Sequence, residues 1–420
     1  MMTARRALLL LVITAFAVMS GAWFTCAWDD LGDGIGLQAP HPSTIITNWT
    51  PRWSPDGQYV VVNLYRDWST PGVYTASAAG DHFQRVFVEP DGVQSSPRVF
   101  PDGRIIYIDY AYKPRFGFVR KGSGPHHWTI GMSDLDGTPL PPISIPSARP
   151  DNVDVSHPQP WPGTGRVVAM VRRWGRDAIA GIHEVTPEGD LHFRDVIEGQ
   201  VGRWRDFEIS PDGLYVAYFQ VHLDEEGSWI GHYPTVSPMN GTKDVLQGPY
   251  IARRNLDGRS TQHSGFSWSA DSRRVFFSTW RRGTACTYTS KVWSINMNNS
   301  KVELVTGTSA AGQVFSVAPS PDGERLALVT EGCNSHAPYR IWSDGESRDL
   351  ISACCTGKQV IYGVLFQDAA RLSWSPDGSR IAVLEDSGRP GEVLRTVNPD
   401  GSDVRALILR NADGSLAPGR

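Results

Sequence analysis

The sequence lacks any run of basic residues, and its charges nearly cancel. Its 40 Lys and Arg residues stand against 44 Asp and Glu residues, which leaves a formal net charge of −4 over 420 residues. A nucleic-acid binder needs a clustered basic surface for its phosphate contacts. We therefore exclude nucleic acid as a partner.

The common signatures of catalytic sites are also absent. The sequence contains no Gly-x-Ser-x-Gly, no His-Glu-x-x-His and no phosphate-cradling Gly-Lys-Ser/Thr loop. Because no Cys-x-x-Cys-His occurs either, covalent haem attachment is excluded. We assign no catalytic residue and expect no cofactor.

Only one long apolar run occurs, and it lies at the N-terminus. Arg5 and Arg6 precede an uncharged apolar run from Ala7 to Met19, which is followed by Ser-Gly-Ala, and no charged residue appears before Asp29. This pattern predicts a signal peptide over residues 1–22, with a membrane anchor over 7–28 as the alternative. Both place the remaining chain outside the cytoplasm, in the periplasm or the extracellular space, and limit membrane contact to this segment.

A short turn motif is what the sequence repeats most often. Residues 53–57 read Trp-Ser-Pro-Asp-Gly and lead into a run of apolar residues. Proline presets φ, aspartate can bond the backbone of its own turn, and glycine accepts the positive φ, so the motif predicts a tight hairpin. We assign a structural turn role to the motif aspartates, which are Asp56, Asp102, Asp212, Asp271, Asp322 and Asp377.

The spacing of these aspartates predicts the architecture. Successive residue numbers differ by 46, 110, 59, 51 and 55, and the long gap holds a degenerate copy at Trp161–Gly165. Seven repeats of strands predict an all-β fold, a seven-bladed β-propeller of four-stranded antiparallel blades, behind the N-terminal signal or anchor helix. We expect a linker over 23–43, the propeller over 44–410 and a tail over 411–420.

These repeats resemble the PD40, or TolB-like, family of β-propellers, within the wider group similar to WD40 repeats. The resemblance covers roughly residues 44–409. Relatives of this kind include periplasmic interaction proteins, propellers fused to peptidases and propeller lyases, so the resemblance implies a fold without a single function. Because only a short stretch precedes the first repeat, we expect no counterpart of the N-terminal α/β domain that TolB carries.

Strand order predicts which face of the propeller binds. The motif turns share one face, so the second-to-third loops lie on the opposite one, and two of these loops are long, over 109–128 and 220–249. Their aromatic and cationic side chains suit a glycan or a partner protein, although loop aromatics can also pack only on one another. The candidate residues on this face are Tyr112, Arg115, His126, His127, Trp128, His222, Trp229, His232, Arg281 and His336.

Two further functions stay open beside this leading hypothesis of an exported, non-catalytic scaffold that binds a protein partner or an envelope glycan. If the loop histidines converge on one metal ion, the protein would be a metal-dependent lyase or hydrolase that acts on an acidic saccharide, similar to oligogalacturonide lyases. A flat, apolar face would instead indicate a structural module of an envelope complex. We assign no metal site.

Cysteines are few, and four of the five fall on the predicted loop face. Cys26 lies near the mature start, which leaves an even number in the exported chain. An oxidising compartment favours disulfides between such neighbours, with a soft-metal site as the alternative. We expect Cys333 to pair with Cys354 or Cys355, and Cys286 with the remaining cysteine.

Overall fold

The part of the chain that the structure describes consists of strands and turns. Within it the computed structural model has 31 strands and no helix, and thus no helix long and apolar enough to cross a membrane. The N-terminal segment 1–49, where a signal or anchor helix is expected, lies outside it. The described residues are 50–66, 70–86, 92–111, 128–144, 153–173, 180–186, 191–197, 207–226, 229–240, 246–252, 261–282, 288–308, 313–331, 339–343, 346–351, 371–384, 391–411 and 415–419.

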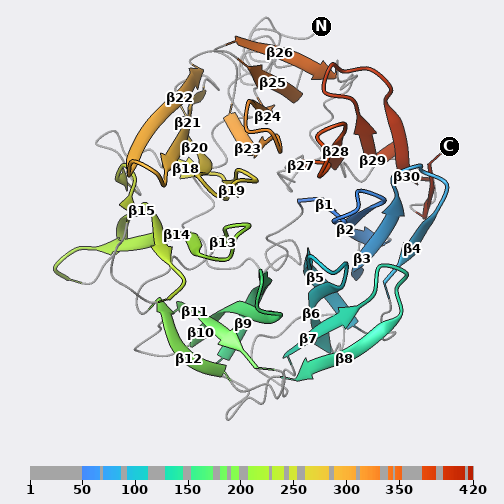
Figure 1. Ribbon diagram of the computed structural model, residues 1–420, viewed down its shortest axis with the longest axis horizontal. Coiled ribbons are helices and arrows are strands. Elements are labelled where there is room, and N and C mark those ends of the chain that lie inside the picture. Colours follow the sequence, from blue (N-terminus) through green and yellow to red (C-terminus); the bar gives the residue numbers. More distant parts are fainter. Residues whose placement is uncertain are drawn as a thin grey trace, which may run out of the picture.

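These strands form seven antiparallel sheets that follow one another in a ring around a central axis (Figure 1). We number the sheets 1 to 7 in chain order. Sheet 1 comprises β1 (Arg52–Trp53), β2 (Tyr59–Arg66), β3 (Thr70–Ser77) and β4 (Phe83–Arg85). Sheet 2 comprises β5 (Gly92–Val99), β6 (Ile105–Ala111), β7 (Trp128–Ser133) and β8 (Pro139–Ser144). Sheet 3 comprises β9 (Val153–Trp161), β10 (Arg166–Arg173), β11 (Ala180–Val185) and β12 (Leu191–Ile197).

The remaining sheets continue the ring, and three of them have five strands. Sheet 4 comprises β13 (Glu208–Ile209), β14 (Tyr215–Leu223), β15 (Trp229–Pro238), β16 (Leu246–Gln247) and β17 (Ile251–Ala252). Sheet 5 comprises β18 (Thr261–His263), β19 (Ser267–Trp268), β20 (Arg274–Arg282), β21 (Tyr288–Asn296) and β22 (Lys301–Thr308). Sheet 6 comprises β23 (Gln313–Pro319), β24 (Arg325–Glu331), β25 (Tyr339–Ser343) and β26 (Glu346–Ile351). Sheet 7 comprises β27 (Arg371–Trp374), β28 (Ile381–Leu384), β29 (Gly391–Val397), β30 (Arg405–Arg410) and β31 (Leu416–Pro418).

The hydrophobic core lies between the sheets. Buried apolar side chains of the described residues gather in seven clusters, and each cluster is shared by two neighbouring sheets. Val60 and Val62 of sheet 1 pack with Leu384 and Leu394 of sheet 7, so the first and last sheets close the ring by side-chain packing. Both faces of each sheet are therefore buried, which explains why the second strands read as continuous apolar runs.

A serine at the start of each intact motif organises the turn. The Ser54 hydroxyl accepts a hydrogen bond from the Tyr59 N–H at 2.9 Å and donates one to Asp56 Oδ1 at 2.5 Å. Asp56 Oδ1 also accepts the Gln58 N–H at 3.0 Å, and Gly57 has a φ of 71°. The same serine-to-aspartate bond recurs in sheets 4 to 7, through Ser210, Ser269, Ser320 and Ser375.

The motif tryptophans join neighbouring sheets. Trp374 donates its indole N–H to the Ala318 carbonyl at 2.9 Å, and Trp268 donates to the Glu208 carbonyl at 2.9 Å. Trp53 donates to the Ser373 carbonyl at 3.1 Å, so the bond that links sheets 6 and 7 is repeated at the closure of the ring. Each bond runs to the innermost strand of the preceding sheet.

The degenerate copy of the motif forms the expected hairpin, but its tryptophan bonds the following sheet instead of the preceding one. Trp161 ends β9, and the turn that follows it leads into β10 of sheet 3. Its indole N–H donates to the Gly213 carbonyl of the following sheet at 2.9 Å. A Cβ on Gly213 would lie 2.7 Å from the Pro162 carbonyl oxygen, so only glycine fits between these two turns.

Two boundaries differ from those expected from the sequence. The predicted tail over 411–420 contributes β31, which pairs with β30 as the outermost strand of sheet 7. Within the predicted loop over 220–249, β14 runs on to Leu223 and β15 begins at Trp229, in a hairpin held by continuous pairing. Strand pairing in both places satisfies backbone groups that a loop would leave to water.

Replacement of the motif serine tests its role in the turn. Ser54→Ala leaves the Tyr59 N–H without its acceptor and Asp56 without its hydroxyl donor, so we expect the free energy of unfolding to fall by about 1 to 3 kcal/mol. Ser379→Ala is the control, because this exposed serine only adds a bond to Asp377, and it should cost under about 0.5 kcal/mol. Urea titration of both variants measures the difference, and equal losses would contradict the role.

Candidate functional site

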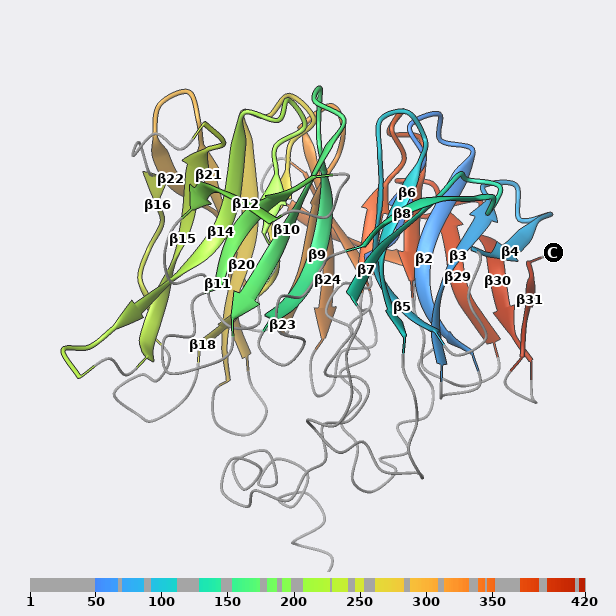
Figure 2. The same cartoon turned by 90° about the horizontal axis from the view of Figure 1, so that it is seen from below.

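Among the described residues, the hairpin of β14 and β15 extends outward on the face opposite the motif turns, which we call the loop face. Figure 2 shows this hairpin reaching outward from the ring at the lower left, while the motif turns lie along the upper side. Gln220 pairs with Tyr233 and His222 pairs with Gly231, so these residues share one side of the hairpin. β17 adds a third strand, pairing Gly231 with Ala252.

Three aromatic rings meet on this side of sheet 4. His222 stands nearly perpendicular to Tyr233 and to Tyr250, with ring centroids 5.6 Å apart in both pairs. The two tyrosine rings are 5.2 Å apart and inclined by 47°. His222 is exposed, and Tyr250 is 43% exposed. The cluster is therefore a surface feature with fixed ring orientations.

A pair of amides extends the same surface. Gln247 donates its side-chain N–H to Gln220 Oε1 at 2.8 Å. We call the set Gln220, His222, Tyr233, Gln247 and Tyr250 the sheet-4 platform. It combines aromatic faces with amide donors and acceptors, which is the chemistry that binds a sugar ring or a polar peptide.

Tyr250 is held in place by a backbone bond and by a glycine. Its hydroxyl donates to the Ile230 carbonyl at 2.9 Å. A Cβ on Gly231 would lie 2.5 Å from this hydroxyl, so glycine is required where the ring crosses the strand. Burial, and then the neighbouring Tyr233, raise the pKa of Tyr250, which keeps the hydroxyl protonated and able to donate at neutral pH.

The structure separates the two histidines that were expected together in one loop. His222 lies on the platform, whereas His232 is 2% exposed within β15 and stacks edge-on against Phe219 at 5.3 Å. His232 pairs with Ile251 of β17 and faces the interior toward sheet 5. Its placement as a loop residue was wrong, because alternation along the strand turns neighbouring residues to opposite sides.

Three more candidates lie at strand ends of the loop face. Trp128 begins β7, Trp229 begins β15, and Arg281 lies near the end of β20 with its side chain exposed. Trp229 belongs to the same strand as Tyr233 of the platform, whereas Trp128 and Arg281 belong to sheets 2 and 5. Tyr112, Arg115, His126, His127 and His336 lie outside the described residues, as do Cys286, Cys333, Cys354 and Cys355. Among the residues that are described, no group of three or more His, Cys, Asp or Glu is placed to hold a metal ion.

A charged network that the sequence did not lead us to expect joins the innermost strands of sheets 1 to 4. Glu208 of β13 lies 3.2 Å from Arg52 Nη1 of β1 and 3.0 Å from Arg98 Nη2 of β5. Gln159 of β9 donates to the Phe207 carbonyl and to Glu208 Oε2, and its oxygen accepts the Ile209 N–H at 3.1 Å. The innermost strands of sheets 1 to 4 are thereby tied together.

The signal for this network was present in the motif. Arg52, Arg98 and Glu208 each stand two residues before the motif serine or its equivalent. Equivalent positions of successive sheets lie at one level of the ring, so opposite charges there meet at the axis. The pairing itself needed the closed ring, because Arg52 and Glu208 are 156 residues apart.

Comparison with solved structures finds this fold in proteins of different function. An oligogalacturonate lyase in complex with manganese matches with a TM-score of 0.54 at 12% identity, over 81% of this chain and 86% of the lyase. Hydrazine synthase of Kuenenia stuttgartiensis matches with a TM-score of 0.51 at 12% identity, over 87% and 98% of the two chains. A puromycin-hydrolysing peptidase of Mycobacterium tuberculosis matches with 0.51 at 13%, over 90% of this chain and 55% of the peptidase.

These matches show the fold alone. The chain is an all-β protein of the propeller type, as the turn motif predicts. No protein-family model matches the chain, and no curated protein matches it. The narrower assignment to the PD40 family stays a prediction.

Removal of the axial carboxylate tests the network. Glu208→Gln leaves Arg52 and Arg98 facing each other, and Arg98 has a side chain only 6% exposed. We expect the free energy of unfolding to fall by about 2 to 3 kcal/mol, since the buried Arg98 guanidinium loses its ion pair with Glu208. Glu184→Gln is the control, because its partner Arg166 is 49% exposed, and it should cost under about 1 kcal/mol. A smaller loss for Glu208→Gln than for Glu184→Gln in urea titration would refute the network's role.

Proposed function

We propose that this chain is an exported, non-catalytic, seven-bladed β-propeller of the TolB-like kind that binds an envelope glycan through its loop face. The observation that carries the proposal is the sheet-4 platform, where exposed His222 and Tyr250 stand beside the Gln220–Gln247 amide pair. Aromatic faces stack on the apolar faces of sugar rings, and amides bond their hydroxyls.

The scaffold suits such a platform because its rings are already ordered before binding. The tyrosine hydroxyl bond and the edge-to-face contacts hold the side chains without a ligand. The opposite side of the same hairpin is anchored by Phe219 and Ile251 in the core shared with sheet 5. Preordered groups lose little conformational entropy on binding, which favours affinity for a ligand with few contacts.

A protein partner is the second candidate, and one observation favours it. Ile230, whose backbone carbonyl accepts the Tyr250 hydroxyl, is 37% exposed, and an exposed aliphatic side chain on a hairpin that also carries tyrosines is typical of a protein interface. The third candidate, a metal-dependent lyase or hydrolase of acidic saccharides, loses support because His222 and His232 face opposite sides of one hairpin.

Substitution on the platform distinguishes these candidates. On a glycan array, Tyr250→Ala should bind about two- to tenfold more weakly than the unchanged chain, since one aromatic contact contributes about 0.5 to 1.5 kcal/mol. Tyr250→Phe should keep most of the affinity, because the stacking face remains. Leu214→Ala, an exposed apolar residue next to a motif turn, is the control. Undiminished glycan binding by Tyr250→Ala would refute the platform, and affinity capture of a protein lost only in Ile230→Ser would support the partner instead.

Export and disulfide formation belong to the same proposal and are tested together. Mass spectrometry of the mature protein should find an N-terminus after Ala22, whereas retention of residues 7–28 would show an anchor. Peptide mapping without reduction should link Cys333 to Cys354 or Cys355. Four free thiols in the exported chain would contradict the bridges.

A further inference from the structure

A cavity lies on the motif-turn face, at the seam where sheet 7 meets sheet 1. Its volume is about 350 Å³, at the lower end of the range for small-ligand sites. The side chains that matter for its chemistry are Trp53, Asp56 and Gln58 of sheet 1 and Asp377 and Arg380 of sheet 7. This cavity is remote from the sheet-4 platform and independent of the glycan proposal.

The neighbouring seam between sheets 6 and 7 shows how a cation fills the equivalent position. There the guanidinium of Arg325 lies over the Trp374 ring, 4.9 Å from its centroid. The same guanidinium lies 3.1 Å from Asp322 Oδ2. A motif tryptophan and a motif aspartate together therefore hold a guanidinium in this fold, through the ring face and the carboxylate.

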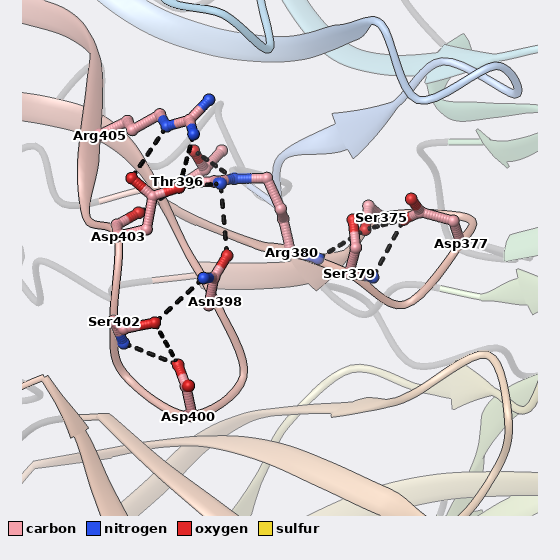
Figure 3. Close-up of polar contacts among 10 residues, drawn as sticks. All are labelled: Ser375, Asp377, Ser379, Arg380, Thr396, Asn398, Asp400, Ser402, Asp403 and Arg405. Carbon is pink, nitrogen blue, oxygen red and sulfur yellow. Dashed lines mark hydrogen bonds and ion pairs between the residues drawn. The ribbon is translucent and has the colours of Figure 1, made fainter.

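At the cavity seam the corresponding arginine is directed elsewhere. Arg380 occupies the place in sheet 7 that Arg325 occupies in sheet 6, five residues after the motif serine. Its guanidinium bonds Asp403 Oδ2 at 2.8 Å, Thr396 Oγ1 at 3.1 Å and Asn398 Oδ1 at 3.3 Å. Figure 3 shows it turned toward these residues, on the opposite side from Asp377. The Arg380 guanidinium therefore does not lie over the Trp53 ring.

The two cavity aspartates also differ from three other motif aspartates. Oδ2 of Asp102, Asp271 and Asp322 each faces an arginine of its own hairpin, at 2.8, 3.8 and 3.1 Å. Among the described residues, Asp56 and Asp377 have no such arginine, and their hydrogen bonds use Oδ1.

The cavity aspartates are ionised under ordinary conditions. The hydroxyls of Ser54 and Ser375 are the largest cause that holds the pKa values of Asp56 and Asp377 below their usual range. Two carboxylates therefore line one cavity beside an indole ring, while Arg380 is already paired with Asp403. Such a site attracts a cation.

We propose that this cavity binds the guanidinium of an arginine side chain of a partner protein. The guanidinium lies over Trp53 and bonds Asp377 Oδ2, as Arg325 does with Trp374 and Asp322 one seam away, and it also bonds Asp56 Oδ2. Arginine fits this site better than lysine because a planar guanidinium covers an indole and bonds two carboxylates at once. The motif-turn face is thus a second binding face, for a basic segment.

Calorimetric titration of the full chain tests the proposal with the blocked tripeptide Ac-Gly-Arg-Gly-NH2 as the probe. The same peptide with citrulline keeps the shape and removes the charge, and it should bind at least tenfold more weakly. Raised salt should weaken the arginine peptide alone, because the contact is ionic and partly exposed. Methylguanidinium should bind more weakly than the peptide, and equal affinity would show a site for a free cation rather than for a side chain.

Two variants and a matched control locate the binding. Asp56→Asn with Asp377→Asn keeps the Oδ1 acceptor of each turn and should weaken the arginine peptide at least tenfold. Gln58→Arg should abolish binding, because an arginine two residues after the motif aspartate bridges it in sheets 2 and 5, as Arg104 and Arg273 do. Asp212→Asn is the control, since this motif aspartate lies outside the cavity and should leave binding unchanged.

The opposite results would overturn the proposal. Unchanged affinity in Gln58→Arg, equal binding of the citrulline peptide, or an equal loss in Asp212→Asn would each exclude the cavity as the site. No heat of binding for the arginine peptide up to tens of millimolar would do the same. The Gln58→Arg arm remains decisive if the double variant fails to fold.

Discussion

The packing of each sheet against both of its neighbours is the constraint on which the rest of this structure depends. A four-stranded sheet with two apolar faces cannot bury both by itself, and a row of such sheets would leave the first and last faces in water. Closing the ring removes those two exposed faces, and the cluster shared by sheets 7 and 1 is the result. Trp53 repeats at this seam the bond that Trp374 makes one seam earlier, so closure uses the contact that joins sheets elsewhere.

Burial of both faces places the polar contacts that repeat from sheet to sheet at the strand ends, and those that tie sheets 1 to 4 together near the axis. The motif serine and aspartate satisfy the turn amides at one end, which keeps these turns short and alike. Departures from the repeat are therefore informative. Sheet 4 departs by extending its hairpin into the platform, and sheet 7 departs by turning Arg380 toward Asp403, which leaves the cavity beside Trp53. Both proposed binding surfaces lie where the repeat is broken.

Local sequence patterns were sufficient to predict the motif hairpins. Proline, aspartate and glycine set the turn conformation within four residues, so each turn could be predicted from the sequence. This includes the degenerate copy after Trp161. The hairpin of β14 and β15 was mistaken for a loop because its apolar and polar residues mix, and only the pairing of the two strands out to Leu223 and Trp229 shows its length. The tail over 411–420 was misjudged for the same reason, since β31 is ordered by pairing with β30.

The amino-acid sequence by itself determined the turn, the strand that follows it and the repetition that demands a ring. These features depend on neighbours in the chain and on the number of copies. The tertiary structure alone decided that His232 is buried while His222 is exposed, that Arg52 and Arg98 share Glu208, and that the cavity opens beside Trp53. The physical reason is that these contacts join residues from different strands and sheets, and their distances exist only once the ring has closed.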